Sequence, residues 1–169
     1  LHFLVTDSYQ HLYTTGSPEA RWAAEYLDER VASILDALKK KNLYDSTDVF
    51  IVSDHGFHNI SKAVRPNVLL KHEGLIRLDK AGLVVEQDAT VVMNHGAAHL
   101  YVLDRERRAD IIEMLKPKLA ALEGIKAVYD ESEFDSLGLP SPSEDERMAD
   151  LILEAKPGYY IVNDVDGVS

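Results

Sequence analysis

The strongest constraint on the fold is the order of three segments at the start of the chain: an apolar run, a long helical pattern and a second apolar run. Leu1–Thr6 and Asp48–Val52 are short continuous apolar runs, which are typical of strands buried on both faces of a parallel sheet. The regular segment between them predicts a helix that crosses over the sheet. A strand, a helix and a strand form a βαβ unit, so we predict an α/β fold with a parallel sheet and a right-handed crossover.

The helix between the two predicted strands has clear boundaries. Ser17 is a typical N-cap, Pro18 suits the first helical position, and the cations of Lys39–Lys41 suit the C-terminal end. Its apolar residues recur with the spacing of one buried face: Leu27, Val31, Ile34, Leu35 and Leu38. We expect this face to be buried.

The middle of the chain follows a different pattern. Ala89–Met93 and His99–Leu103 alternate like two strands around a Gly-Ala turn. An amphipathic helix is expected over Asp104–Leu115, where Pro117 should kink or restart it, and a third strand over Ile125–Tyr129. Two strands, a helix and a strand predict an α+β lobe inserted into the main sheet.

These patterns divide the chain into three expected segments. Residues 1–64 would form a core βαβ segment, residues 65–148 an inserted cap lobe, and residues 149–169 the return to the core sheet. The last segment is expected to contain two strands, Leu151–Ala155 and Tyr159–Val162.

Composition excludes several classes of function. The chain has 29 acidic and 18 basic residues and a net charge of −11. This charge argues against a partner that is a nucleic-acid polymer, because phosphate neutralisation needs clustered Lys and Arg, and against a polybasic membrane-surface protein. The lack of cysteine excludes disulfides, thiolate metal sites and a Cys nucleophile. An acidic chain that binds a phosphate anion needs a local positive charge, and metal ions are the obvious source.

The ends of the chain are unusual for a natural protein. It begins with Leu1 inside an apolar stretch and ends at Ser169 without a visible helix or strand stop, whereas natural termini are usually polar. We therefore expect this sequence to be a segment of a longer protein. No apolar run reaches the length of about 18 residues that a transmembrane helix needs, so no membrane span is expected.

Two pairs of Asp and His follow the two predicted strands. Asp7 and His11 come just after the first strand, and Asp54 and His55 just after the second. Because parallel sheets place ligand sites at the carboxyl ends of their strands, both pairs should meet at one edge of the sheet. Carboxylate oxygen and imidazole nitrogen are ligands for zinc or a similar divalent metal. Two such pairs suit two metal ions about 4 Å apart, as in phosphoryl transfer.

Each pair also has a simpler interpretation. An isolated Asp-x-x-x-His is common by chance, and Asp54-His55-Gly56 could be a turn capped by its Asp. The metal hypothesis rests on both pairs occurring at the strand ends of one βαβ unit. Among the other histidines, His58 is expected on a solvent-facing loop, or as a group that orients a ligand. His95 and His99 are expected to line a substrate pocket from the cap lobe.

Two segments resemble a known family. Val52–Phe57 resembles the Ser-Asp-His-Gly-Phe/Met signature of the alkaline phosphatase superfamily. Asp7–His11, followed by Gly16–Glu19, is similar to the Asp-x-x-x-His…Gly-Pro segment of its type I phosphodiesterase/nucleotide pyrophosphatase family. Further segments resemble family landmarks in the same order: Arg65–Val68, Gly96–Val102 and Lys156–Tyr160. The resemblance covers nearly the whole chain.

The resemblance implies a parallel sheet sandwiched by helices, an inserted cap lobe and a two-zinc site. Asp7 and His11 match the ligands of one metal, and Asp54 and His55 match ligands of the other. In the family, a Thr or Ser nucleophile and another Asp ligand lie upstream, and a third His ligand lies downstream. None of these is matched here, so the resemblance implies a central fragment, without the nucleophile and inactive by itself.

The leading hypothesis is a metal-dependent hydrolase of phosphodiester or pyrophosphate bonds in small, nucleotide-type substrates. The resemblance implies that it acts through a covalent phospho-enzyme on the Thr or Ser outside this chain. Two alternative functions stay open: a superfamily relative that hydrolyses phosphonates, phosphomonoesters or sulfate esters, and a non-catalytic binding module on the same fold. The identity of the metal also stays open, because manganese or iron would accept the same ligands as zinc.

Overall fold

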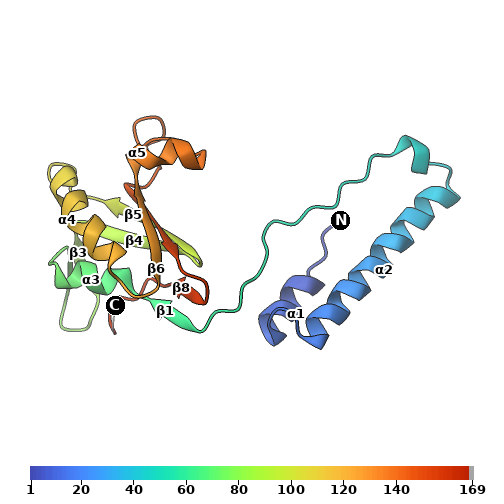
Figure 1. Cartoon of the computed structure of the whole chain (residues 1–169), viewed down its shortest axis with the longest axis horizontal. Helices are drawn as coiled ribbons and strands as arrows, with labels where there is room; N and C mark the ends of the chain where they lie inside the picture. Colours follow the sequence, from blue (N-terminus) through green and yellow to red (C-terminus); the bar gives the residue numbers. More distant parts are fainter. Residues whose placement is uncertain (168–169) are drawn as a thin grey trace. The chain divides into compact units, whose positions relative to one another are not determined.

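The computed structural model describes residues 1–167 (Figure 1). The chain forms two compact units, Leu1–Asn59 and Ile60–Ser169, and each is described by itself. In the described range, no helix combines the length and the apolar character needed to cross a membrane.

The first unit is built from two helices. α1 spans Val5–Tyr13, α2 spans Pro18–Lys40, and a single 3₁₀ turn, η1, follows at Tyr44–Ser46. α2 confirms the predicted helix, because Ser17 is its N-cap and accepts a hydrogen bond from the backbone N–H of Ala20 at 3.0 Å.

A ladder of aromatic rings joins these two helices. The ring centroids of Tyr9 and Tyr13 on α1 are 5.6 Å apart, and Tyr9 lies 5.1 Å from Trp22 on α2. Trp22 is 5.5 Å from Tyr26, over which the guanidinium of Arg30 lies at 4.9 Å. These spacings are those of favourable aromatic and cation–π pairs, so the ladder fixes α1 against α2.

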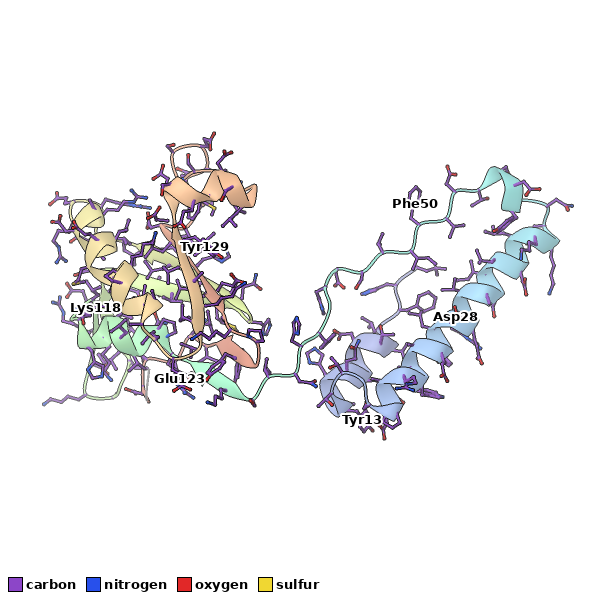
Figure 2. The ribbon with its side chains drawn as sticks, viewed as in Figure 1. Tyr13, Asp28, Phe50, Lys118, Glu123 and Tyr129 are labelled. Carbon is purple, nitrogen blue, oxygen red and sulfur yellow. The ribbon has the colours of Figure 1, made fainter. Side chains whose placement is uncertain are left out.

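Neither strand predicted for the first unit forms. Leu1–Leu4 has no regular structure, and Val5 and Thr6 belong to α1. Residues 48–52 run without a paired strand, and Phe50, for example, is 83% exposed (Figure 2). A strand needs a neighbour whose N–H and C=O groups pair with its own, and the first unit, which is described throughout, offers none. The predicted βαβ unit is therefore absent from this structure.

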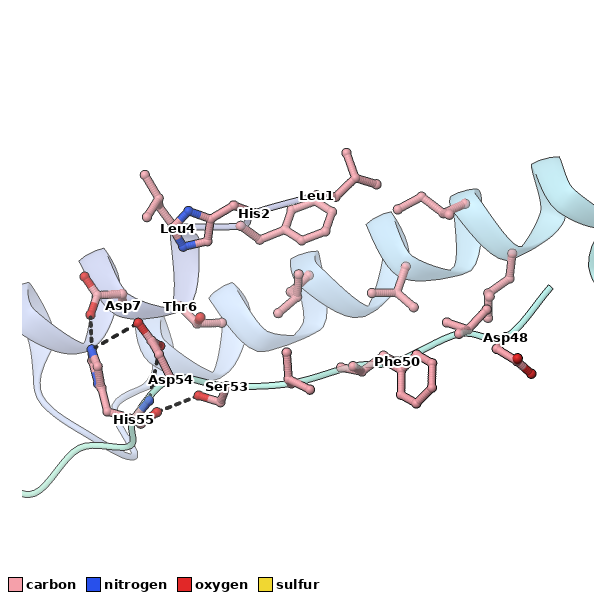
Figure 3. A pocket seen from close by; sticks show the side chains of 18 of the residues that line it. Leu1, His2, Leu4, Thr6, Asp7, Asp48, Phe50, Ser53, Asp54 and His55 are labelled. Carbon is pink, nitrogen blue, oxygen red and sulfur yellow. Dashed lines mark hydrogen bonds and ion pairs between the residues drawn. The ribbon is translucent and has the colours of Figure 1, made fainter. Parts of the chain in front are cut away.

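The predicted apolar face of α2 lines an open cavity instead of a sheet. Its five apolar residues are half-buried: Leu27, Val31, Ile34, Leu35 and Leu38. Together with Leu1–Leu4 and Thr47–His55 they surround a cavity of about 810 Å³ within the first unit (Figure 3). The spacing of the apolar residues thus predicted correctly which face of α2 packs against other parts of the unit, although this face is only half-buried.

The second unit contains a four-stranded antiparallel sheet in the order β4-β5-β7-β6. β4 spans Ala89–Asn94 and β5 spans Ala97–Val102, which confirms the predicted hairpin. β6 at Ile125–Asp130 and β7 at Leu151–Ala155 are also predicted strands, and β7 pairs with both β5 and β6.

The main helix of this unit is α4, Arg108–Ala120, and its apolar side chains join those of the sheet in one buried core. The core includes Ile111, Leu115 and Leu119 of α4 together with Leu100, Leu151 and Leu153 of the sheet. The helix continues through Pro117 to Ala120, so the predicted restart there is wrong, and the predicted kink stays a prediction. Pro117 has no N–H to donate to the carbonyl four residues earlier, so this one helical hydrogen bond is absent.

Smaller elements complete the second unit. α3 spans Pro66–His72, and β1 (Lys62–Val64) pairs in parallel with β8 (Tyr159–Ile161). The remaining elements are the paired strands β2 and β3, at Ile76–Leu78 and Val84–Gln87, and the short helices α5 and η2, at Glu131–Phe134 and Asp135–Leu137. The two strands expected to return to a core sheet thus lie here, and the division into core and cap lobe stays a prediction.

Candidate metal centre

All four predicted ligands lie in the first unit. Asp7 and His11 are on α1, where residues four apart share one face of the helix. Asp54 and His55 lie on the irregular segment that follows residues 48–52. The elements that carry them therefore differ from the predicted strand ends, because one pair is on a helix.

The structure nevertheless brings the two pairs together, and Figure 3 shows Asp7 of one pair beside Asp54 and His55 of the other. The Nε2 atoms of His11 and His55 lie 3.6 Å and 3.7 Å from the same oxygen, Oδ1 of Asp7. Nε2 of His55 is also 3.8 Å from Oδ2 of Asp54. The Asp7 carboxylate thus lies between two imidazoles that come from separate parts of the chain.

The types of donor atom fit zinc, while their spacing is slightly wide. Two ligands about 2.0 Å from one tetrahedral zinc ion lie roughly 3.3 Å from each other, and the three pairs here are separated by 3.6–3.8 Å. Among residues 1–167, no group of three or more His, Asp or Glu side chains is arranged to hold a metal ion. The structure therefore contains ligand pairs but no complete coordination shell.

These ligands are accessible to solvent. The side chain of Asp7 is 40% exposed, and that of Asp54 is 83% exposed. Water screens attraction between groups exposed to this degree, so the four residues contribute little to the stability of the fold. A cation can therefore reach these ligands directly from solvent.

Local hydrogen bonds set the conformation around His55. Its backbone N–H donates to Oδ1 of Asp54 at 3.1 Å, and the hydroxyl of Ser53 donates to the His55 carbonyl at 2.5 Å. Asp54 thus makes a local contact with the backbone, the capped turn of the simpler interpretation is not formed at residues 54–56, and Oδ2 of Asp54 faces His55. Nδ1 of His55 lies 3.1 Å from the Gly56 carbonyl oxygen. When Nδ1 carries the proton and donates to this oxygen, the lone pair of Nε2 faces the two carboxylates, as metal binding requires.

Two contacts at this site have no counterpart in the sequence analysis. The ring of Phe57 lies 4.8 Å from the His11 ring and 5.4 Å from the His55 ring, edge to face with both. Oδ1 of Asn59 accepts hydrogen bonds from the backbone N–H and the hydroxyl of Thr15, each at 3.1 Å. Phe57 belongs to the signature segment, which could have drawn attention to it, whereas nothing in the sequence marks Asn59.

The other histidines lie apart from these pairs. His58 is exposed on the chain after Phe57. His95 and His99 belong to the second unit, His95 in the turn between β4 and β5 with a φ of +53° and His99 on β5. Their predicted place at the edge of a substrate pocket stays a prediction.

Comparison with known proteins identifies a family that the chain matches. The profile of a family described as type I phosphodiesterase / nucleotide pyrophosphatase matches residues 1–168. A search of curated proteins found no significant match.

Two solved structures share the fold. Phosphonoacetate hydrolase from Sinorhizobium meliloti 1021, in complex with phosphonoacetate, is 21% identical, with a TM-score of 0.65. Murine ectonucleotide pyrophosphatase / phosphodiesterase 5 is 17% identical, with a TM-score of 0.63. Each match covers 94% of this chain and 37% of the other, so the chain spans little more than a third of these structures. The likenesses confirm the predicted mixed α/β fold similar to that of alkaline-phosphatase-like enzymes, while the parallel sheet sandwiched by helices and the inserted cap lobe stay predictions. With the profile match over nearly its whole length, the chain belongs to the type I phosphodiesterase/nucleotide pyrophosphatase family.

Proposed function

We propose that the protein containing this chain is a metal-dependent hydrolase of phosphodiester or pyrophosphate bonds in small, nucleotide-type substrates. The observation that carries the proposal is the position of the Asp7 carboxylate, within 3.7 Å of imidazole nitrogens from two separate segments. Family membership supports the class of reaction.

In this proposal, the two pairs of ligands hold two divalent ions, with zinc as the expected metal. Asp7 and His11 would contribute to one site, and Asp54 and His55 to the other. Bound zinc would supply positive charge for phosphate oxygens and lower the pKa of a bound hydroxyl. The carboxylates of Asp7 and Asp54 would supply negative charge that balances the charge of the ions. The Gly56 carbonyl orients the His55 ring.

In this proposal, the nucleophile belongs to a part of the whole protein other than these 169 residues. It is expected to be a Thr or Ser of the whole protein, and this chain by itself is expected to be inactive. The contribution of this chain would be the metal ligands and, in the predicted cap lobe, residues that select the substrate.

A phosphonate is the second candidate substrate. The observation that favours it is the likeness to a solved phosphonoacetate hydrolase, whose ligand in that structure is phosphonoacetate. The reaction classes are separated by testing four substrates on the whole protein: a nitrophenyl phosphodiester, a nitrophenyl phosphomonoester, a nitrophenyl sulfate, and phosphonoacetate, whose hydrolysis is followed by phosphate release.

The hydrolysis of a nitrophenyl phosphodiester tests the site. In the whole protein, we expect the double variant Asp54→Ala, His55→Ala to lose at least about 100-fold in rate, because ligands of a catalytic metal are removed. His58→Ala, which removes an exposed imidazole from the same segment, should retain the rate. Unchanged hydrolysis by the double variant would show that the site is assigned wrongly, and no hydrolysis of any ester by the unaltered protein would favour a binding module.

A further inference from the structure

Phe57 is the one side chain in aromatic contact with histidines of both ligand pairs among residues 1–167. Its ring centroid lies 4.8 Å from that of His11, with an interplanar angle of 84°. The corresponding values for His55 are 5.4 Å and 62°. Both geometries are edge-to-face, the arrangement that aromatic rings prefer because the positive edge of one meets the negative face of the other.

Such contacts matter for a histidine ligand because its ring orientation is only loosely set by its own torsion angles. The χ2 torsion of His has broad minima, so neighbouring groups decide where Nε2 points. His55 has a second orienting contact, between Nδ1 and the Gly56 carbonyl oxygen. The contacts found for the His11 side chain are the Asp7 carboxylate and the Phe57 ring.

The chain around Phe57 is tied to the loop that follows α1. Asn59, two residues further on, accepts two hydrogen bonds from Thr15, each at 3.1 Å. This connection holds the Phe57 segment beside the helix that carries Asp7 and His11, so the ring keeps its place between the two histidines.

We propose that Phe57 is a positioning residue, which holds the imidazoles of His11 and His55 with both Nε2 atoms facing the Asp7 carboxylate, where the proposed metal ions would bind. The inference rests on the function proposed above and concerns the same site. Phe57 is half-buried and lies outside the fully buried apolar core, so its ring is not needed for core packing. Its predicted effect is on zinc affinity, with little effect on the fold.

The test is zinc affinity of the whole protein, measured by competition with a chelating dye. We expect Phe57→Leu to weaken zinc binding about tenfold, the lower end of the range for residues that orient metal ligands. Phe57→Tyr keeps the ring and should stay within about twofold of the unaltered protein. The matched control is Phe50→Leu, because Phe50 lies on the same segment and lines the same cavity but is 83% exposed.

The visible absorption of the cobalt-substituted protein gives a second readout, since its bands report ligand geometry. These bands should change in Phe57→Leu and persist in Phe57→Tyr. Thermal melting checks that the variants fold, and Phe57→Met, which loses the ring but fills similar space, replaces Phe57→Leu if that variant does not.

The outcomes separate this inference from the proposed function. Unchanged zinc affinity in Phe57→Leu, with zinc content reduced to at most one ion in the double variant Asp54→Ala, His55→Ala, would overturn the role of Phe57 and leave the metal assignment intact. An equal loss in Phe57→Tyr and Phe57→Leu would also overturn it. Failure of the unaltered protein to bind zinc, manganese or iron would instead overturn the proposed function.

Discussion

At the scale of single residues, Gly124 is the glycine of the second unit that leaves least room for a side chain, and it precedes β6. Its φ is +93°, a conformation that residues with a side chain rarely adopt. A Cβ at this position would lie 2.3 Å from Cδ1 of Tyr159 on β8 and 2.7 Å from Cγ2 of Val64 on β1. Gly124 is therefore required for the parallel pair of strands to pack beside this turn.

We expect Gly124→Ala to lower the free energy of unfolding by about 3 kcal/mol, through overpacking and backbone strain together. Chemical denaturation of the two proteins measures this difference. The control is Gly138→Ala, where φ is +70° but no atom lies within 4 Å of the new Cβ, so only the strain of about 1 kcal/mol applies. Equal losses in the two variants would contradict this account.

The sequence predicted the residues of the candidate site from their chemistry, since Asp and His are the ligand types of zinc. It could not predict polar anchors whose partners are distant in sequence. Buried Asn67 bonds the backbone of Val91 through both atoms of its amide. Buried Asp150 accepts hydrogen bonds from the Val102 backbone and from Arg108. No local pattern marks such residues, because only the folded chain brings the partners together.

At the scale of elements, one cation links the C-terminal half of α4 to the start of α5. The ammonium of Lys116 donates to Oδ2 of Asp130 at 2.6 Å and to Oε2 of Glu133 at 2.7 Å. Asp130 and Glu133 also form the capping box of α5. These hydrogen bonds hold the pKa of the Asp130 carboxyl below its usual value of 3.8, and that of Glu133 below 4.5.

Lowered carboxyl pKa values make stability depend on pH. The charged form is favoured in the folded state, so its contribution is present above the unfolded pKa of about 4 and is lost as pH falls through the lower folded pKa. We expect Asp130→Asn, which keeps a good N-cap but does not titrate, to show a shallower loss of stability below about pH 4. Denaturation of both proteins across this pH range measures the slopes, and identical slopes would contradict a role for the Asp130 carboxylate.

Prediction of elements from the sequence succeeded where each element finds its partners within the chain. The strands β4, β5, β6 and β7 pair with one another. The alternation of β4 and β5 and the short apolar runs of β6 and β7 indicated them correctly. The segments Leu1–Thr6 and 48–52 have the composition of buried strands, yet the first unit contains no strand to pair with them. A segment becomes a strand only when a neighbouring strand pairs with it, so composition alone could not decide whether these two segments form strands.

At the scale of the whole molecule, the net charge and the candidate site are related. The net charge of −11 leaves no general attraction for a phosphate anion, so a phosphate-ester hydrolase with this chain needs local cations. The chain belongs to a family of phosphodiesterases and pyrophosphatases, and it spans 37% of the two solved structures described above. The complete site and its nucleophile are accordingly proposed for the whole protein.

The most direct test of the central claim is the zinc content of the whole protein after equilibrium dialysis against zinc, measured by atomic emission. We expect about two zinc ions per protein, and at most one in Asp7→Ala or in the double variant Asp54→Ala, His55→Ala, because each change removes ligands of one proposed site. The control His58→Ala should keep both ions. Zinc content unchanged by the loss of Asp7, or of Asp54 and His55, would contradict the assignment of this metal centre.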